Sequence, residues 1–382
     1  MFALLKKNIF HILLLLTSIA LFYSNLQNKD YNWDLPGYLG SSYLVQNVDK
    51  QELLSQVYSS IQKQASEKEF KEVIGNQKPG NWRFFISQNS TAFYAQIPYY
   101  SIKVFYIFLI YFFQSIGFSG WDSVIFPNLI SYFISGFLLF FFFYSIFNNK
   151  AISFFLCVIL LLIPPFRDLA TSPTPDIIIV LLIVWLLYSF LKRHELYIQS
   201  LILLLVIFTR PDYIIFSLTY LASYFILYYL KTRKINFQVI FYGLIFISCY
   251  YLILTVNNYP GWKDVFYDTF IQRRNFVTGT ADFSFQEYRK VIFFNIVNFK
   301  RITCLSLLLL VSVFSLSKDL RLRVFACMAF FNIFLKFIFF PSTEPRFYVA
   351  FILFLFIILI FSAKQYFSKI QNLITLTLSK RY

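Results

Sequence analysis

Charged residues are scarce in this sequence. Asp, Glu, Lys and Arg make up only 14% of its 382 residues, whereas hydrophobic residues make up 58%. A soluble domain has about 25% charged residues, so a soluble globular protein is excluded. The mean hydropathy is +0.63, and long apolar runs recur from one end of the chain to the other. Because lipid is the solvent that accepts such surface, we expect an integral membrane protein.

Histidine and cysteine are also rare. The two histidines are His11, in the first apolar run, and His194, in a short basic loop. A metal held by histidines, or a Ser-His pair, is therefore excluded from the large loops. The four cysteines all lie inside apolar runs, so neither a disulfide framework nor zinc spacing is present. No glycine loop that could bind a nucleotide appears, and no cofactor is indicated.

The apolar runs predict an all-α fold, a polytopic membrane helix bundle of about 10–11 spans in a single transmembrane domain, 1–382. Two of the runs are too short to cross a hydrocarbon core of about 30 Å upright, and we expect them to be buried within the bundle. The first run loosely resembles a signal peptide, but it is long enough to span and is interpreted as a retained helix. The predicted spans are 4–24, 122–147, 151–165, 175–191, 196–209, 213–230, 235–256, 302–317, 322–340 and 347–363.

Basic residues in the short loops predict the orientation of the bundle. These loops and the two chain ends hold most of the charge behind the net +16, and they contain only two carboxylates, Glu195 and Asp319. The other sixteen of the eighteen carboxylates fall in segments on the opposite side. By the positive-inside rule the basic face is cytoplasmic, so the charge indicates membrane anchoring rather than nucleic-acid binding. We expect a multi-pass protein of the bacterial inner membrane with its N-terminus inside.

One segment, 97–117, is apolar enough to span but carries Lys103 and Gln114. Counting it as a crossing would reverse the side of every later loop and place the basic loops outside. We therefore predict that it is re-entrant or interfacial on the outer side. The alternative is eleven spans, with a neighbouring segment that fails to cross.

Two outer loops are large, 25–121 and 257–301. In the first, 49–74 lacks Pro and Gly and repeats apolar residues at helical spacing, which predicts an amphipathic helix on the membrane surface. The second contains the pair Arg273-Arg274, followed by an aromatic and basic stretch from Phe285 to Lys300.

Asp34 is the first candidate for chemistry. It follows the first span by about ten residues and precedes Pro36-Gly37, which we expect to form a turn that holds it near the membrane. A carboxylate in this place could remove a proton from a substrate that arrives from outside, and it could equally cap a helix or form a turn.

Three further motifs open predicted spans on the outer side. They are Pro175-Asp176, Arg210-Pro211-Asp212 and Glu344-Pro345-Arg346-Phe347. An arginine at the outer membrane edge must reach water or find an anion, such as a lipid headgroup or a lipid-linked phosphate. The acids could instead serve only as N-terminal charges of their helices. The candidate substrate-binding residues are Asp176, Arg210, Asp212, Arg273, Arg274, Glu344 and Arg346.

Taken together, these motifs resemble the GT-C superfamily of membrane glycosyltransferases, which includes protein O-mannosyltransferases and aminoarabinose transferases. The resemblance covers most of the chain, although its motifs are short. It implies that Asp34 corresponds to the acidic residue early in the family's first outer loop. This sequence has a single Asp where many relatives have an acidic pair, which leaves metal dependence open.

The resemblance implies transfer of a sugar from a polyprenyl-phosphate donor to a glycan, lipid or protein acceptor on the outer face. Asp34 would be the catalytic base of an inverting reaction, and arginines would stabilise the phosphate that leaves. Two alternatives remain open. One is a polysaccharide polymerase or ligase, and the other is a non-enzymatic transporter, which would place ionisable residues near mid-membrane.

Overall fold

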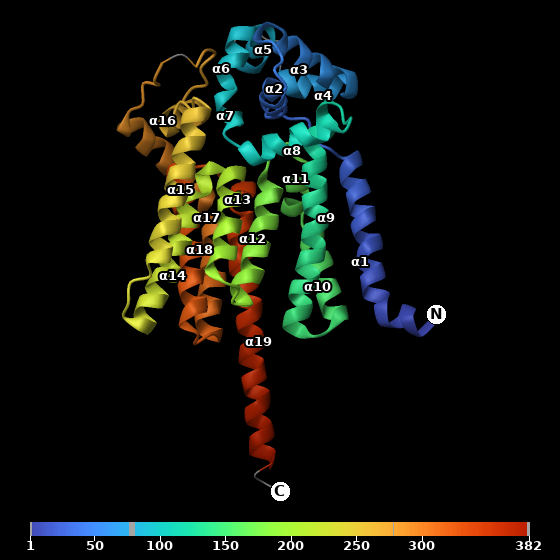
Figure 1. The fold of residues 1–382 in the computed structure, drawn as a ribbon, viewed down its shortest axis with the longest axis vertical. Helices are drawn as coiled ribbons and strands as arrows, with labels where there is room; N and C mark the ends of the chain where they lie inside the picture. Colours follow the sequence, from blue (N-terminus) through green and yellow to red (C-terminus); the bar gives the residue numbers. More distant parts are fainter. Residues whose placement is uncertain (1, 76–80, 278, 380–382) are drawn as a thin grey trace.

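A computed structural model describes residues 2–75, 81–277 and 279–379, and this part of the chain is helical without any β-strand. Long helices stand side by side in a bundle, and short helices form a layer across one end of it (Figure 1). This is the predicted class, a helical bundle with the composition of a multi-pass membrane protein.

Each of the ten predicted spans corresponds to a helix. Seven helices in the described residues are long and apolar enough to cross a membrane, and up to nine crossings result if each bent pair counts as one. The two runs predicted to be too short are α10, which is bent by 63° against α11 (Pro164–Thr171), and α13. Both α13 and α12 are below the length of a full crossing. The ten helices are α1 (Phe2–Gln27), α9 (Gly120–Phe147), α10 (Lys150–Leu162), α12 (Asp176–Leu191), α13 (Leu196–Thr209), α14 (Ile214–Thr232), α15 (Phe237–Val256), α17 (Phe285–Leu316), α18 (Leu320–Phe339) and α19 (Val349–Ser379).

Prolines set the ends of α12 and α13 that face the layer of short helices. We call it the outer layer, and this end of the bundle the outer end, because the sequence predicts the large loops to lie outside. Pro175 immediately precedes α12, and Pro211 begins a 3-10 turn, η1 (Pro211–Tyr213), between α13 and α14. Because proline lacks an N–H, it is tolerated at the first turn of a helix but not in its interior. α12 packs against α9, α13 and α19, and most of its side chains are buried. The start of α12 therefore lies inside the bundle, where Asp176 is buried.

The outer layer begins with α2 (Leu35–Val45) and continues through short helices. Segment 49–74 is not one surface-lying helix, as predicted, but two, α3 and α4, which are separated at Ser66. The Ser66 side chain accepts from the Glu69 backbone N–H while Glu69 bonds back to Ser66, a capping box that starts a new helix. Leu53, Val57 and Ile61 of α3 are fully buried by protein rather than lipid. The remaining bounds are α3 (Lys50–Gln64), α4 (Glu67–Ile74), α5 (Trp82–Gln88), α6 (Ser90–Gln96), α7 (Pro98–Ser101) and α8 (Val104–Ser115).

The segment around Lys103 does not form one straight helix. The helices on either side of it are bent by 110°, and α8 runs across the end of the bundle (Figure 1). Lys29, after α1, forms an ion pair of 3.0 Å with Asp122, at the start of α9. Because these residues flank the whole first outer loop, the loop starts and ends at the same face of the bundle.

The second predicted outer loop is largely helical. It contains α16 (Trp262–Phe270), and the Ser284 side chain caps the next helix by accepting from the Glu287 N–H. The aromatic and basic stretch 285–300 is thus the first half of the 32-residue helix α17, rather than loop. Two short elements complete the outer end, α11 (Pro164–Thr171) and η2 (Pro345–Phe347).

Candidate functional site

A cavity of about 650 Å³ lies where the outer layer meets the bundle. Its walls come from the start of α2, the α7–α8 junction, the outer ends of α12 to α14, the second outer loop and the α18–α19 connection. Seven of the eight predicted site residues line it, namely Asp34, Asp176, Arg210, Asp212, Arg273, Glu344 and Arg346. The tertiary fold thus brings together motifs that are spread over most of the chain.

Asp34 is the N-cap residue of α2, although its side chain makes no capping hydrogen bond. The expected Pro36-Gly37 turn is wrong, because both residues lie in the first turn of α2. Gly37 packs against the Tyr100 ring so closely that a Cβ atom would lie 2.3 Å from it. Helix α2 therefore packs on α7 through a close contact that glycine permits. Because Asp34 is the N-cap residue of α2, this contact also fixes its position.

The Asp34 carboxylate is largely buried and faces Arg346, with 3.7 Å between Oδ2 and Nη1. Burial raises the pKa of the Asp34 carboxyl above its usual value, while the positive charges of Arg346 and Lys103 partly oppose this rise. Arg346 also lies 2.5 Å from Glu344, measured from Nε to Oε2. Asp34 thus combines burial, a raised pKa and a place in a cavity, which are typical of a functional carboxylate.

Asp176 and Asp212 are engaged by cations. Arg210 forms ion pairs with both, binding Asp212 through Nε at 3.1 Å and Nη2 at 3.2 Å. The other Asp176 oxygen accepts from the Thr174 hydroxyl at 2.9 Å. Lys336, near the end of α18, pairs with Asp212. Both carboxylates therefore have partners on each oxygen, and this network joins α12, the α13–α14 connection and α18.

Two cations at the cavity have no carboxylate partner in the described chain. Lys103 donates to the Tyr99 carbonyl and lies 5.4 Å from the Tyr100 ring centre. Arg273 donates through Nη2 to the Gln96 side chain, its Cζ lies 4.8 Å from the Trp82 ring centre, and its Nε has no hydrogen-bond partner. Five cations and four carboxylates line the cavity, which gives a formal balance of +1. Lys103 and Arg273 carry +2 of this balance, and the other seven charged groups together carry −1.

Arg274, the eighth predicted residue, does not line this cavity. Its Nε lies 2.7 Å from Asp268 and its Nη2 lies 2.9 Å from Asp264, and both carboxylates are buried. Tyr99 also donates to Asp268 at 2.5 Å. Arg274 is therefore the centre of an ion-pair cluster that ties the second outer loop to α7, and its neighbour Arg273 faces the cavity instead.

Sequence reasoning did not include Lys103 and Lys336 among the site residues. The signal was present, because each is a lysine in an otherwise apolar segment, and such residues usually face a cavity or a partner. Around the cations, much of the cavity wall is apolar or aromatic, including Tyr250, Leu254 and Phe340. Within the described ranges, no group of three His, Cys, Asp or Glu residues is arranged to hold a metal ion.

Comparisons with protein-family models, curated proteins and solved structures find no match for this chain.

Proposed function

We propose that this protein is a membrane glycosyltransferase that uses a sugar linked to a polyprenyl phosphate. One observation carries the proposal: the buried base candidate Asp34 shares a cavity with Lys103 and Arg273, two cations without a carboxylate partner. A cationic, partly apolar cavity at the outer end of a membrane bundle suits a ligand that has one negative phosphodiester and a hydrocarbon chain.

The reaction would be a single displacement with inversion at the anomeric carbon. An acceptor hydroxyl oxygen attacks this carbon while the bond to the phosphate oxygen breaks with its electron pair. Asp34 takes the hydroxyl proton, and the polyprenyl phosphate leaves as an anion. The new glycosidic bond replaces the bond to phosphate, so no oxidant, reductant or other reactant is needed.

Arg273 and Lys103 would stabilise the charge that grows on the leaving phosphate. Charge-assisted contacts of this kind are strongest in a site from which water is excluded. Arg210 and Lys336 are already neutralised by Asp176 and Asp212, so in this proposal they shape the cavity. Tyr250, Leu254 and Phe340 would contact the first isoprene units of the lipid.

The proposal is tested by incubating the purified protein in nanodiscs with a farnesyl-phosphate sugar and following loss of this donor. Asp34→Asn removes the charge and keeps the shape, so turnover should fall about 10²–10⁴-fold. Asp282→Asn is the matched control, because Asp282 is an exposed acid of the same outer region outside the cavity.

Asp176→Asn and Asp212→Asn distinguish the competing bases. Near-normal turnover of Asp34→Asn, with loss in one of the other two, would move the base but keep the glycosyltransferase. Activity in all three variants, or no donor loss by the wild type, would refute the proposal in favour of a transporter. Transfer of preassembled glycans rather than single sugars would instead indicate a polymerase or ligase.

A further inference from the structure

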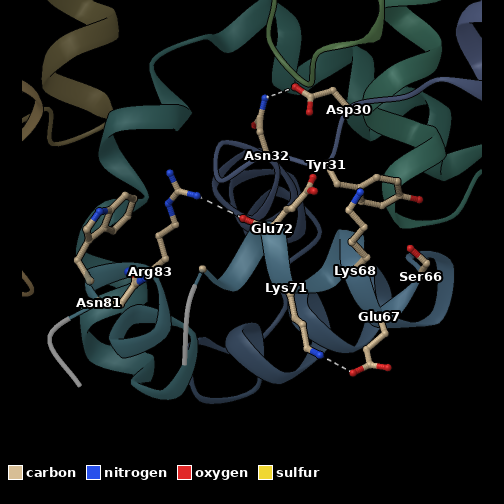
Figure 2. Close-up of a pocket in the computed structure, with 12 residues that line it drawn as sticks. Asp30, Tyr31, Asn32, Ser66, Glu67, Lys68, Lys71, Glu72, Asn81 and Arg83 are labelled. Atoms are coloured by element: carbon tan, nitrogen blue, oxygen red, sulfur yellow. Dashed lines mark hydrogen bonds and ion pairs between the residues drawn. The ribbon is translucent and has the colours of Figure 1, made fainter. Parts of the chain in front are cut away.

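A second and larger cavity lies in the outer layer, apart from the cavity that holds Asp34. It is an open cleft of about 1270 Å³ (Figure 2). One side comes from residues 30–32, just before α2, and another from Ser66 and the exposed face of α4. Arg83 of α5 completes it, donating to the backbone carbonyl of Glu72 at 3.3 Å. The cleft is thus built from the first outer loop alone.

The lining of the cleft is polar and electrically balanced. Among the described lining residues, three carboxylates, Asp30, Glu67 and Glu72, accompany three cations, Lys68, Lys71 and Arg83, so their formal balance is zero. A neutral balance does not favour a strongly charged ligand. Dense hydrogen-bonding groups beside an aromatic ring are instead suited to a neutral ligand that has many hydroxyl groups.

Several of these groups are available to a ligand. Glu67 pairs with Lys71 at 2.5 Å, but within the described chain Glu72 and Lys68 have no ion-pair or hydrogen-bond partner for their side chains. Asn32 bridges Asp30 and Ser172 through its amide, at 3.0 and 3.2 Å. Hydroxyl groups of a sugar can donate to the Glu72 carboxylate and accept from the Lys68 ammonium. Trp82 supplies an aromatic surface at the same cleft.

The cleft and the candidate active site lie on the two sides of one short segment, and a small third cavity shares residues with both. Asp30 and Asn32 line the cleft whereas Trp33 and Asp34 line the inner cavity, so five consecutive residues form the wall between them. A third cavity of about 20 Å³ shares Trp82 and Arg83 with the cleft and Trp33 and Arg273 with the inner cavity. This space suffices for about one water molecule.

Aromatic and guanidinium groups surround this small cavity. The rings of Trp33 and Trp82 meet edge to face, with centres 5.5 Å apart, and Arg83 lies 5.6 Å from the Trp82 ring centre. Arg273 covers the same ring at 4.8 Å. The side chains of Trp33, Trp82 and the two arginines thus separate the cleft from the inner cavity.

We propose that the cleft binds the acceptor and that this acceptor is a neutral carbohydrate, an inference that rests on the proposed function. The sugar lies against Trp82 and bonds to Glu72 and Lys68, and its attacking hydroxyl passes Trp33 to reach Asp34. The donor occupies the inner cavity from the membrane side, so the two substrates approach Asp34 from opposite directions.

The test uses the full chain in nanodiscs and saturation-transfer difference NMR. The probes are neutral trisaccharides of glucose, galactose, mannose and N-acetylglucosamine, with a mixed-charge hexapeptide as the competing class. At least one trisaccharide should bind, and Glu72→Gln and Lys68→Gln should each weaken its affinity about tenfold, the loss expected for one hydrogen bond to a charged group. Glu52→Gln, an exposed acid on α3 outside the cleft, should leave the affinity unchanged.

Thermal unfolding is measured to check that each variant is folded. The replaced side chains are exposed, so their replacement should leave the fold intact. Failure of every trisaccharide to bind, equal affinity in Glu72→Gln and wild type, or binding of the hexapeptide alone would overturn the inference. Donor loss is measured in parallel with farnesyl-phosphate sugar. A protein that consumes this donor but fails the sugar test loses only the cleft assignment, whereas one that binds sugar without consuming donor loses only the proposed function.

Discussion

Arg346 and Asp34 lie at opposite ends of the sequence, and in the folded protein Nη1 of one is 3.7 Å from Oδ2 of the other. Arg346 also contacts Glu344, so a single guanidinium connects the base candidate to the α18–α19 connection. The position of Asp34 in its cavity therefore depends on how the last span packs, as well as on its own helix. This contact gives the proposed base a measurable electrostatic signature.

Replacing Arg346 should move the pH dependence of turnover. Asp34 acts as a base only when it is ionised, and its pKa is raised by burial and lowered by Arg346. Turnover should therefore fall on the acid side of its pH profile, the acid limb, and the midpoint of this fall should lie above the usual carboxylate pKa of about 4. Arg346→Gln removes a positive charge, so the limb should shift to still higher pH. The check is donor loss against pH.

Glu344→Gln is the control for this shift, because it removes the other carboxylate beside Arg346 and keeps the guanidinium. Its acid limb should not rise. If Arg346→Gln left the limb where it is in the wild type, Asp34 would not be the group that titrates.

Asp34→Asn should stabilise the protein at neutral pH. Since burial raises the Asp34 pKa in the folded state, folding favours the protonated carboxyl, and its ionised form reduces stability above that pKa. Asparagine has no charge to bury. The melting temperature of Asp34→Asn should therefore exceed that of the wild type at pH 7, and the difference should vanish as the pH falls below about 4. Equal melting temperatures at both pH values would contradict the burial of this charge.

Arg273 and Arg274 should behave differently although they are adjacent. Arg273→Ala should raise the donor KM about 10–100-fold, because one charge-assisted contact to phosphate is lost, while the fold is kept. Arg274→Ala leaves Asp264 and Asp268 buried without their cation and should lower the free energy of unfolding by about 3–5 kcal/mol. Donor kinetics and thermal unfolding on both variants separate the two roles. Similar kinetic defects in two equally stable proteins would place both arginines at the phosphate.

Cysteines introduced at positions 30 and 119 test the topology, in a variant whose four native cysteines are replaced. Both positions are exposed, and Lys29 contacts Asp122 directly. An impermeant thiol reagent added from outside should thus label both positions in intact cells. Labelling of position 119 only after permeabilisation would mean that segment 97–117 crosses the membrane, and that one further span exists.

The sequence by itself determined the helical membrane class and ten apolar segments that correspond to helices, and it predicted the side to which the basic loops belong. These are one-dimensional properties, because hydropathy and the charge of short loops depend on neighbouring residues along the chain. It also indicated which polar motifs begin spans. The five site residues of these motifs line one cavity, together with Asp34 and Arg273 from the predicted outer loops. The break at Ser66 depends on a capping box. The residues that form it are a weaker signal in the sequence than the apolar repeat around them.

Only the tertiary structure decided which charged residues at the cavity are already paired and which are available to a ligand. Asp176, Arg210 and Asp212 neutralise one another together with Lys336. Asp34 faces Arg346 at 3.7 Å, and Arg273 has no carboxylate partner in the described chain. Arg273 and Arg274 have the same chemistry and adjacent positions, yet one faces the cavity and the other a buried acidic pair. Coulomb interactions depend on distances in space, and those distances between residues such as 34 and 346 exist only once the helices have packed.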